Sequence, residues 1–228
     1  MTAGVDREST ARPASPNRKI EKTKLLLGEG QDEVNFFGAL LKHLGKDDVQ
    51  VLQYGGKQKL SGFLSVLKVD PLWDEVEALL ITRDSDFPRE RSLDPAAQTA
   101  WTSVIDVVRS QGLPVPRVHA ELYGAEDRGT LRVGVFILPD GAADGMLEDL
   151  CLAAAADDPV KPCLDAYFRC IEEKGLTIPR NVLPKARAHA YLASRPIPDK
   201  RVGEAAVAGY WPWEAAALAP LLEFVRRA

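Results

Sequence analysis

Acidic side chains follow apolar runs that have the length and composition of buried strands. Glu29 follows the run LLLG, and Asp84 and Asp86 follow LLIT one residue later. Asp140 ends a third run, and Glu148 lies in the helical segment behind it. Burying a carboxylate is costly unless it is paired or binds a metal ion. Because the carboxyl ends of parallel strands meet at one edge of a sheet, the sequence predicts an acidic site at that edge.

A divalent cation is the simplest way to hold such carboxylates together. Like charges about 4 Å apart repel by about 4 kcal/mol at an effective dielectric constant of about 20. The Asp84-x-Asp86 spacing places two carboxylates on one side of an extended chain, about 7 Å apart. Ligation by carboxylates favours Mg²⁺ or Mn²⁺ over zinc, and the few cysteines and histidines are too scattered for a zinc signature.

The acidic residues also have purely structural interpretations. Asp32 suits the N-cap of a helix that begins near Gly30. Glu33 shares one face of the first helical turn with Glu29, where the helix dipole favours a negative charge by ~0.3–1 kcal/mol. An Asp-x-Asp pair after a strand can consist of a turn cap and a solvated side chain. Glu29 has no comparable structural role and is the first residue to substitute.

Short apolar runs alternate with helical periodicity from residue 23 onward, which predicts an α/β fold with a mostly parallel sheet flanked by helices and a helical C-terminal extension. The last two strands suggest a hairpin or an antiparallel edge. The predicted strands are KTKLLLG (22–28), VQVLQY (49–54), EALLITRDSDF (77–87), VHAELYG (118–124) and LRVGVFILPD (131–140). The predicted helices are about 30–45, 59–69, 94–112 and a helical third that starts at 145.

The helix at 94–112 has recognisable start and stop signals. Asp94 suits the N-cap, Pro95 the first helical position, and Gly112 the position just past the end.

Composition predicts one packed domain with a short tail. Hydrophobic residues make up 46% of the chain, which is ample for a core. Residues 1–19 are polar and rich in Ser, Pro and Arg, so we expect a disordered tail ahead of a single α/β domain at 20–228. No secretory signal or membrane span is recognisable, so we expect a cytoplasmic protein that does not enter membranes. The cysteines are expected to be packing residues: Cys151, Cys163 and Cys170.

A net charge of −4 gives no general attraction to nucleic acid, so a phosphate would have to be held by a local basic group or a bound cation. Gly55, Gly56 and Lys57 lie between a predicted strand and helix, where free N–H groups and a lysine could bind phosphate. A simple glycine turn with a solvated lysine is the alternative. Trp211 and Trp213 are expected to be packing anchors rather than base-stacking platforms.

A later helical segment carries basic side chains that could contact a phosphate backbone or simply be solvated. These residues are Arg180, Lys185, Arg187, His189 and Arg195.

The segments LLLGEGQDEV and LLITRDSDF, in this order and with a crossover unit between them, resemble the Toprim domain. In that domain one strand ends in Glu-Gly and a later strand ends in Asp-x-Asp. Its members include primases, type II and type IA topoisomerases, and nucleases of the overcoming-lysogenization-defect type. The E-G-x-x-E form at Glu29, Gly30 and Glu33 is similar to the nuclease branch. The segments GMLEDL and PKARAHAYLAS look more like a small, uncharacterised Toprim-like family of bacteria and archaea.

The resemblance covers roughly residues 23 to 225 and implies a Toprim-like, Rossmann-like fold. By position, it implies that Glu29 is a general acid/base or metal ligand and that Asp84 and Asp86 bind Mg²⁺. Glu33 and Glu148 would be additional ligands. The chain departs from the family in having LGEG where an aliphatic residue often precedes the glutamate, and it lacks the ATPase half of the large nucleases.

Three functions follow as hypotheses. The first is Mg²⁺-dependent phosphodiester chemistry on nucleic acid, most plausibly cleavage. The second is a non-catalytic Toprim-like module that binds metal and nucleic acid or a nucleotide, or serves as a protein partner subunit. The third is a sugar-nucleotide transferase that uses its Asp-x-Asp to hold Mn²⁺, a hypothesis that leaves Glu29 and Glu33 without a role. The sequence leaves the oligomeric state open.

Overall fold

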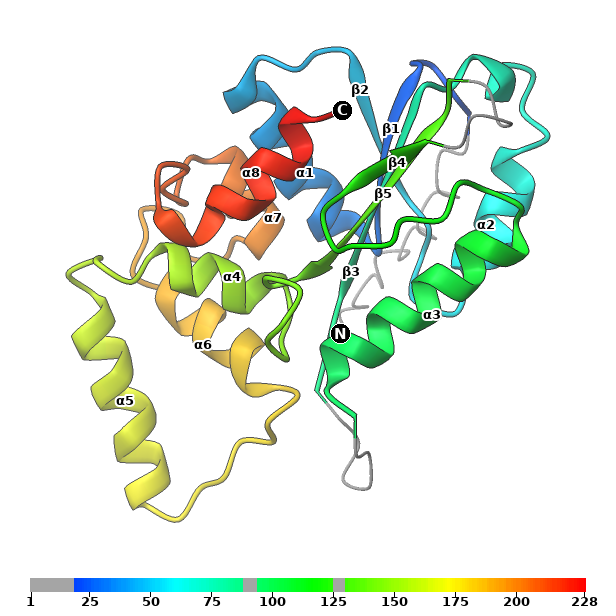
Figure 1. Ribbon diagram of the computed structural model, residues 1–228. Coiled ribbons are helices and arrows are strands. Elements are labelled where there is room, and N and C mark those ends of the chain that lie inside the picture. Colours follow the sequence, from blue (N-terminus) through cyan, green and yellow to red (C-terminus); the bar gives the residue numbers. More distant parts are fainter. Residues whose placement is uncertain (1–18, 88–93, 125–129) are drawn as a thin grey trace, which may run out of the picture.

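The computed structural model describes residues 19–87, 94–124 and 130–228, so the tail predicted at 1–19 lies, except for Lys19, outside this part of the chain. Its centre is a five-stranded sheet with the order β2-β1-β3-β5-β4. β1, β2, β3 and β5 are parallel, whereas β4 pairs antiparallel with β5 at one edge. The predicted fold class and the antiparallel edge are therefore confirmed (Figure 1). The strands are β1 Lys24–Gly28, β2 Val49–Gln53, β3 Ala78–Asp84, β4 Leu122–Gly124 and β5 Arg132–Leu138.

Helices cover both faces of this sheet, and Figure 1 shows α2 and α3 on one side with α1 and the C-terminal helices on the other. The α-helices are α1 Gln31–Leu44, α2 Leu60–Leu67, α3 Ala96–Ser110, α4 Leu147–Ala154, α5 Lys161–Glu173, α6 Leu183–Leu192, α7 Val202–Val207 and α8 Ala219–Arg226. Short 3₁₀ helices are η1 Trp73–Glu75 and η3 Ala216–Leu218.

The central strands are apolar on both faces because each face packs against helices. Leu25 and Leu27 of β1 belong to the core beneath α2 and α3, whereas Leu26 between them belongs to the core beneath α1 and α4. In β3, Ile81 faces the α2/α3 side and Leu80 faces the α1/α4 side. This double burial explains why the strands read as continuous apolar runs rather than as alternating ones.

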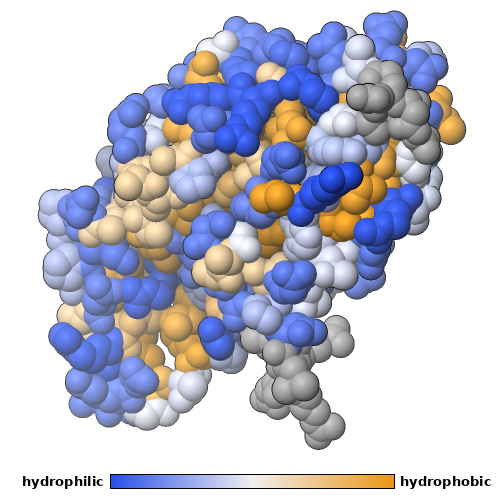
Figure 2. Space-filling view, in the orientation of Figure 1, coloured by the Kyte–Doolittle hydropathy of each residue, from blue (hydrophilic) through white to orange (hydrophobic). Residues whose placement is uncertain are grey.

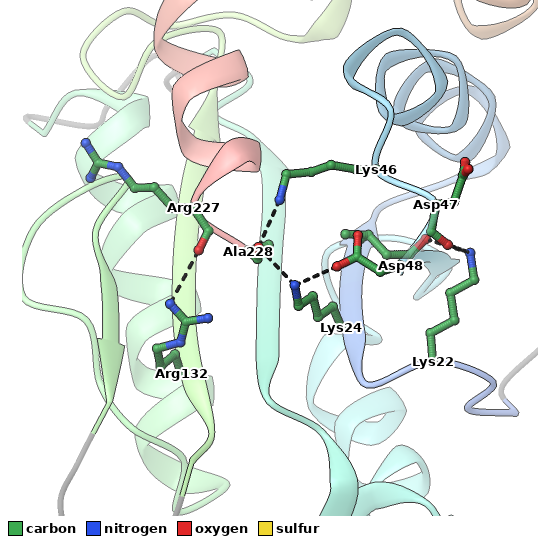
Figure 3. A network of polar contacts seen from close by, with 9 residues as sticks. Lys22, Lys24, Lys46, Asp47, Asp48, Arg132, Arg227 and Ala228 are labelled. Carbon is green, nitrogen blue, oxygen red and sulfur yellow. Dashed lines mark hydrogen bonds and ion pairs between the residues drawn. The ribbon is translucent and has the colours of Figure 1, made fainter.

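The C-terminal helices are tied to the edge of the sheet where the parallel strands begin. The backbone oxygen of Ala228 accepts hydrogen bonds from Lys46 Nζ at 2.9 Å and from Lys24 Nζ at 3.3 Å (Figure 3). Lys24 also pairs with Asp48 at 2.6 Å, and Arg132 donates to the backbone oxygen of Arg227. These contacts leave the opposite edge, where the strands end, to the predicted acidic residues.

The first helix begins and ends close to the predicted positions, but with a different cap. Gly30, not Asp32, is the N-cap of α1, and Glu33 completes the cap by accepting the Gly30 N–H through its side chain. Asp32 lies in the first turn, so the prediction that it caps the helix is wrong. Gly45 ends the helix in the left-handed conformation, with φ of 66°.

The start of α3 also differs from its prediction. Pro95 is the N-cap rather than the first helical residue, because the helix begins at Ala96. The Ala96 N–H is satisfied from far along the chain, by Asp144 Oδ1 at 2.9 Å. Asp94 precedes the cap, so the N-cap prediction for it is wrong. Gly112 does lie just past the end of the helix, with φ of 69°.

The cysteine prediction holds for one residue out of three. Cys151 is buried in α4, but Cys163 and Cys170 are exposed on α5. α5 buries only Leu164 and Phe168, and it extends away from the rest of the molecule (Figure 1). Figure 2 shows apolar atoms in the hollow beside it. None of the helices in the described ranges is long and apolar enough to cross a membrane.

Candidate active site

The ends of β1 and β3 bring the first two predicted acids to one edge of the sheet. β1 ends at Gly28, so Glu29 is the first residue beyond it, and Asp84 is the last residue of β3. The two strands are neighbours with Leu27 beside Ile81. Glu29 and Asp84 therefore lie at the sheet edge where the sequence predicts the acidic site.

Asp84 is held by the start of α4. Its Oδ1 accepts the N–H of Leu147, the first residue of that helix, at 3.0 Å. Burial raises the pKa of Asp84 well above its usual range, and the negative charges of Glu33, Glu29 and Glu148 raise it further. The carboxyl of Asp84 is thus both buried and surrounded by like charges.

Glu33 enters the same group from the first turn of α1. Its side chain is 9% exposed, and its Oε2 accepts the Gly30 N–H at 2.9 Å. Burial raises the pKa of Glu33, while hydrogen bonds from backbone N–H groups act against this. Gly28 allows the close approach of strand and helix, since a Cβ there would lie 2.5 Å from Glu33 Cβ.

Glu148 and Lys185 complete the group from α4 and α6. Burial raises the pKa of Glu148, with Glu33 and Asp32 adding repulsion and Lys185 opposing it. Lys185 also lowers the pKa of Glu33. The positive charge of Lys185 therefore partly balances the acids, an effect that the sequence of its helix did not indicate.

Glu29 has the least satisfied carboxyl group at this edge. Its Oε1 is buried and has no hydrogen-bond partner. Burial raises the pKa of Glu29 to about 7, and repulsion from Glu33 contributes in the same direction. Arg83 and Lys57 lower it, and Asp86 raises it. Near neutral pH the group is consequently balanced between its protonated and ionised forms.

Asp86 departs from the extended geometry that was predicted for the Asp-x-Asp pair. Its φ is 61°, and its backbone pairs with Gly145 through two hydrogen bonds of 2.8 Å. Asp86 Oδ2 contacts Lys57 Nζ at 2.8 Å, whereas Asp84 contacts α4. The two carboxylates therefore have different partners, and the prediction of an extended chain through both residues is wrong.

The glycine turn after β2 binds the backbone of Glu29 and does not leave its N–H groups free for a phosphate. Gly55 and Gly56 have positive φ, and their N–H groups donate to the backbone oxygen of Glu29 at 2.9 and 3.0 Å. The N–H groups of Gly55 and Gly56 are therefore already paired. Of the three residues predicted to bind phosphate in this turn, only Lys57 has a side chain that can exchange its partner for a phosphate. Its ion pair with Asp86 is half-exposed.

Asp140 and Asp32 make structural contacts outside the acidic group. Asp140 is exposed, and its Oδ1 accepts the N–H groups of Ala142 and Ala143 at 2.9 and 2.7 Å, which closes the turn after β5. Asp32 Oδ1 accepts the N–H of Gly203 at 3.4 Å and so contacts α7. The prediction that Asp140 joins the acidic cluster is not supported by these contacts.

The remaining basic and aromatic candidates make structural contacts. Arg187 pairs with Asp165, Arg195 pairs with Asp158 at 3.0 Å, and Arg180 lies 3.8 Å from Asp144. Separately, Trp211 donates its Nε1–H to the Val202 oxygen, and Trp213 packs against Phe36 and His43, which agrees with their predicted packing roles.

The donor chemistry of the acidic group fits a hard divalent cation, although its side chains do not converge on one point. Within residues 19–87, 94–124 and 130–228, no three His, Cys, Asp or Glu side chains are arranged to hold a metal ion. All the donors are carboxylate oxygens, the type that Mg²⁺ and Mn²⁺ prefer. The unpartnered Oε1 of Glu29 is a buried oxygen that a cation or a proton would satisfy.

Two residues near the acids were missed in the sequence. Tyr54 is buried, and its hydroxyl donates to the Thr82 oxygen at 2.9 Å, which braces the ends of the strands from below. Arg83 lies between Thr82 and Asp84, and its buried Nε has no partner. A basic residue inside an otherwise apolar strand was the available signal for Arg83.

The fold and this edge define the class of the molecule: an α/β protein with a mostly parallel sheet and a cluster of acids where the strands end. The chain belongs to the family described as "Protein of unknown function (DUF3226)", whose model matches residues 23–228. No curated protein matches it.

Solved structures that are similar to this chain include C-terminal regions of OLD proteins. The one from Xanthomonas campestris pv. campestris is 16% identical, with 90% of this chain and 93% of that chain covered and a TM-score of 0.47. The one from Burkholderia pseudomallei is 15% identical, with 91% and 98% covered and a TM-score of 0.43.

Proposed function

We propose that this protein is a Toprim-like enzyme that cleaves phosphodiester bonds in nucleic acid with the help of Mg²⁺ or Mn²⁺. One observation carries the proposal: β1, α1, β3 and α4 bring partly or fully buried carboxyls to one sheet edge, where each has a raised pKa. Ordinary packing does not require such a group, since buried like charges oppose folding. These residues are Glu29, Glu33, Asp84 and Glu148.

A bound cation would offset the repulsion among the acids at this edge. Lys57 and Lys185 act on the acids, but the pKa values of Glu29, Glu33, Asp84 and Glu148 stay raised despite them. The residues that would hold the ion are Asp84, Asp86, Glu33 and Glu148, with Glu29 beside them. When bound, a divalent ion stabilises the negative charge that develops on phosphate oxygens during displacement.

Glu29 is suited to transfer a proton. A group with a pKa of about 7 is present in both protonation states near neutral pH, which suits general acid/base chemistry. Its Oε1 is held by no other group, so it is free to accept a proton from an attacking water or to return one to a leaving oxygen. The hydrogen bonds from Gly55 and Gly56 fix the backbone of Glu29 and so limit where this carboxyl can go.

Lys57 and Lys185 supply positive charge on either side of the acids. Lys57 contacts Asp86, and Lys185 acts on Glu33 and Glu148. Both lysines are exposed residues, so a phosphate backbone can reach them from solvent. This local arrangement allows nucleic acid to bind even though the whole chain is acidic.

A cleavage assay on DNA and RNA, with and without Mg²⁺ or Mn²⁺, tests the proposal. Asp84→Asn keeps the oxygen that accepts the Leu147 N–H but removes the charge, so we expect folded protein with at least about a hundredfold lower activity. Asp140→Asn is the matched control, because Asp140 also follows a strand but serves a turn. Metal-independent cleavage, or equal activity in both variants, contradicts the proposal.

A non-catalytic binding module is the second candidate. Lys57 and Lys185 are exposed near the acids, an arrangement that suits binding of a phosphate backbone without any chemical step. Tight, metal-dependent binding of an oligonucleotide without any product would select this function. A sugar-nucleotide transferase is tested in the same preparations by thermal shift, where stabilisation by nucleotide sugars but not by oligonucleotides would support it.

A further inference from the structure

Arg83 has a buried donor with nothing to bind. Its Nε is enclosed, and no hydrogen bond or ion pair joins its side chain to any other described residue. The residue as a whole is partly exposed, so the guanidinium is within reach of solvent. Buried donors without an acceptor are rare in folded proteins because they lower the free energy of unfolding, so each one needs a physical explanation.

The neighbouring strand presents a matching acceptor. Leu27 lies beside Ile81 in the parallel pairing of β1 with β3, and Glu29 and Arg83 each follow this pair by two residues. Glu29 Oε1 is the other buried polar atom without a partner in the described residues. A donor and an acceptor at the ends of neighbouring strands are thus both left unpaired.

The side chain of Arg83 projects toward the face of the sheet that α2 and α3 cover. Leu27 and Ile81 belong to the core beneath α2 and α3, and side chains two residues apart on a strand share a face. Arg83 therefore follows Ile81 toward α2 and α3, while Asp84 points to the other face and contacts α4. Arg83 and Asp84 thus point to opposite faces of the sheet, and Arg83 does not neutralise Asp84 through an ion pair.

The two groups influence each other without touching. Arg83 lowers the pKa of Glu29, yet no ion pair within 4.0 Å forms between them. If Arg83 served only to neutralise Glu29, a direct pair would be the most favourable arrangement, since it would satisfy both buried atoms. Two buried polar atoms are thus left without partners, and a phosphate oxygen is an acceptor that would satisfy the one on Arg83.

We propose that Arg83 is a phosphate-binding residue, whose Nε–H donates to a nonbridging oxygen of a phosphate group placed beside Glu29. Guanidinium suits this task because its planar N–H groups match phosphate oxygens. The inference rests on the proposed function in expecting a phosphodiester as the natural ligand. Inorganic phosphate shares the same chemistry and serves as the simpler probe.

The positions of Arg83 and the acids also determine how a phosphate would be oriented in the site. Asp84 contacts α4, Glu33 lies on α1 and Glu148 on α4, whereas Arg83 projects toward α2 and α3. A phosphate held by Arg83 would present its reacting atom to Glu29, the group suited to move the proton. Arg83 would thereby determine which phosphate of a longer chain is placed at the acids.

NMR of the full chain in EDTA tests the inference directly, because a buried arginine Nε–H gives a resonance of its own. We expect this resonance, identified by its loss in Arg83→Lys, to shift saturably with inorganic phosphate and with a thymidine dinucleotide. Arg83→Gln should weaken binding of both probes by about tenfold or more, read from backbone amides. Arg109→Gln is the control, since Arg109 is exposed and pairs with Asp106 on α3.

The outcomes separate this inference from the proposed function. It is overturned if neither probe shifts the Arg83 resonance, or if Arg83→Gln binds both within about twofold of the wild type. Binding of phosphate but not of the dinucleotide supports the role of Arg83 and points to a terminal phosphate as the source. Should Arg83→Gln not fold, Arg83→Lys provides the same comparison, with partial binding expected. Arg83-dependent phosphate binding without any cleavage would refute the proposed function alone.

Discussion

The carboxyl oxygen Oδ1 of Asp84 accepts the backbone N–H of Leu147 at 3.0 Å and so joins the last residue of β3 to the first residue of α4. This bond fixes the start of the helix that carries Glu148. One side chain therefore holds the site together and contributes charge to it. The two roles can be separated by substitution.

Asp84→Asn and Asp84→Ala should differ in stability. Asparagine can still accept the Leu147 N–H without the cost of a buried charge, so we expect it to be at least as stable as the wild type in EDTA. Alanine leaves that N–H without its partner, which should cost about 1–2 kcal/mol relative to asparagine. Urea unfolding measures both, and equal stability of the two variants would show that the bond contributes nothing.

The raised pKa of Glu29 predicts how stability depends on pH without metal. Burial moves the pKa from 4.5 to about 7, so the folded state binds more protons than the unfolded state between these values. The contribution of Glu29 is therefore fully present below pH 4.5 and is lost as pH rises through 7. Glu29→Gln mimics the protonated form and should be more stable than the wild type at pH 8, by up to about 3 kcal/mol, but not at pH 4.5.

Thermal unfolding in EDTA at several pH values checks this dependence. Glu75→Gln, at an exposed position in η1, provides the comparison for a glutamate outside the site. A gap between wild type and Glu29→Gln that is constant across pH would contradict the assignment.

Close packing of α7 on α1 predicts a strong effect at one glycine. A Cβ at Gly203 would lie 2.2 Å from the backbone oxygen of Asp32, so Gly203→Ala must push the two helices apart. We expect a loss of about 2–4 kcal/mol in the free energy of unfolding. Gly38→Ala, in α1 with open space around it, should instead stabilise by about 0.5–1 kcal/mol. Similar effects at the two positions would show that the helices are not in contact there.

The sequence predicted the scaffold of the site because strong local signals specify it. Apolar runs such as LLLG mark strands buried on both faces, and Gly45 marks the end of α1 through its left-handed conformation. The position of Glu29 directly beyond β1 follows from these signals alone. Alternation of strands and helices then determines the edge at which the acids lie.

Several contacts within the site could not be predicted from residue types and strand patterns. Asp86 leaves the extended conformation because its backbone pairs with Gly145, nearly sixty residues later. Asp140 resembles a site acid in sequence, but it binds its own turn. Gly30 can cap α1 because Glu33 reaches back to it, which made the more typical cap residue Asp32 unnecessary. Tertiary pairing decided the case of Asp86, whereas local hydrogen bonds decided those of Asp140 and Gly30.

Lys57 should matter for binding and not for folding. Its ion pair with Asp86 is half-exposed, and such pairs contribute about 0–1 kcal/mol, so Lys57→Ala should unfold within about 0.5 kcal/mol of the wild type. If Lys57 exchanges Asp86 for phosphate, the variant should bind a single-stranded oligonucleotide several-fold more weakly and with a smaller salt dependence. Fluorescence anisotropy measures both, with Lys59→Ala from the same loop as the control. Equal losses in both variants would indicate a general charge effect instead.

The central claim is that the acids at the ends of β1 and β3 hold a divalent cation. Anomalous diffraction from crystals soaked in Mn²⁺ tests it most directly, because it locates the ion relative to individual carboxylates. The account predicts an ion bound by Asp84 together with Glu33, Asp86 or Glu148, with Glu29 beside it, and no such ion in Asp84→Asn crystals. Carboxylates that remain without an ion at saturating Mn²⁺, or an ion that persists unchanged in Asp84→Asn, would contradict it.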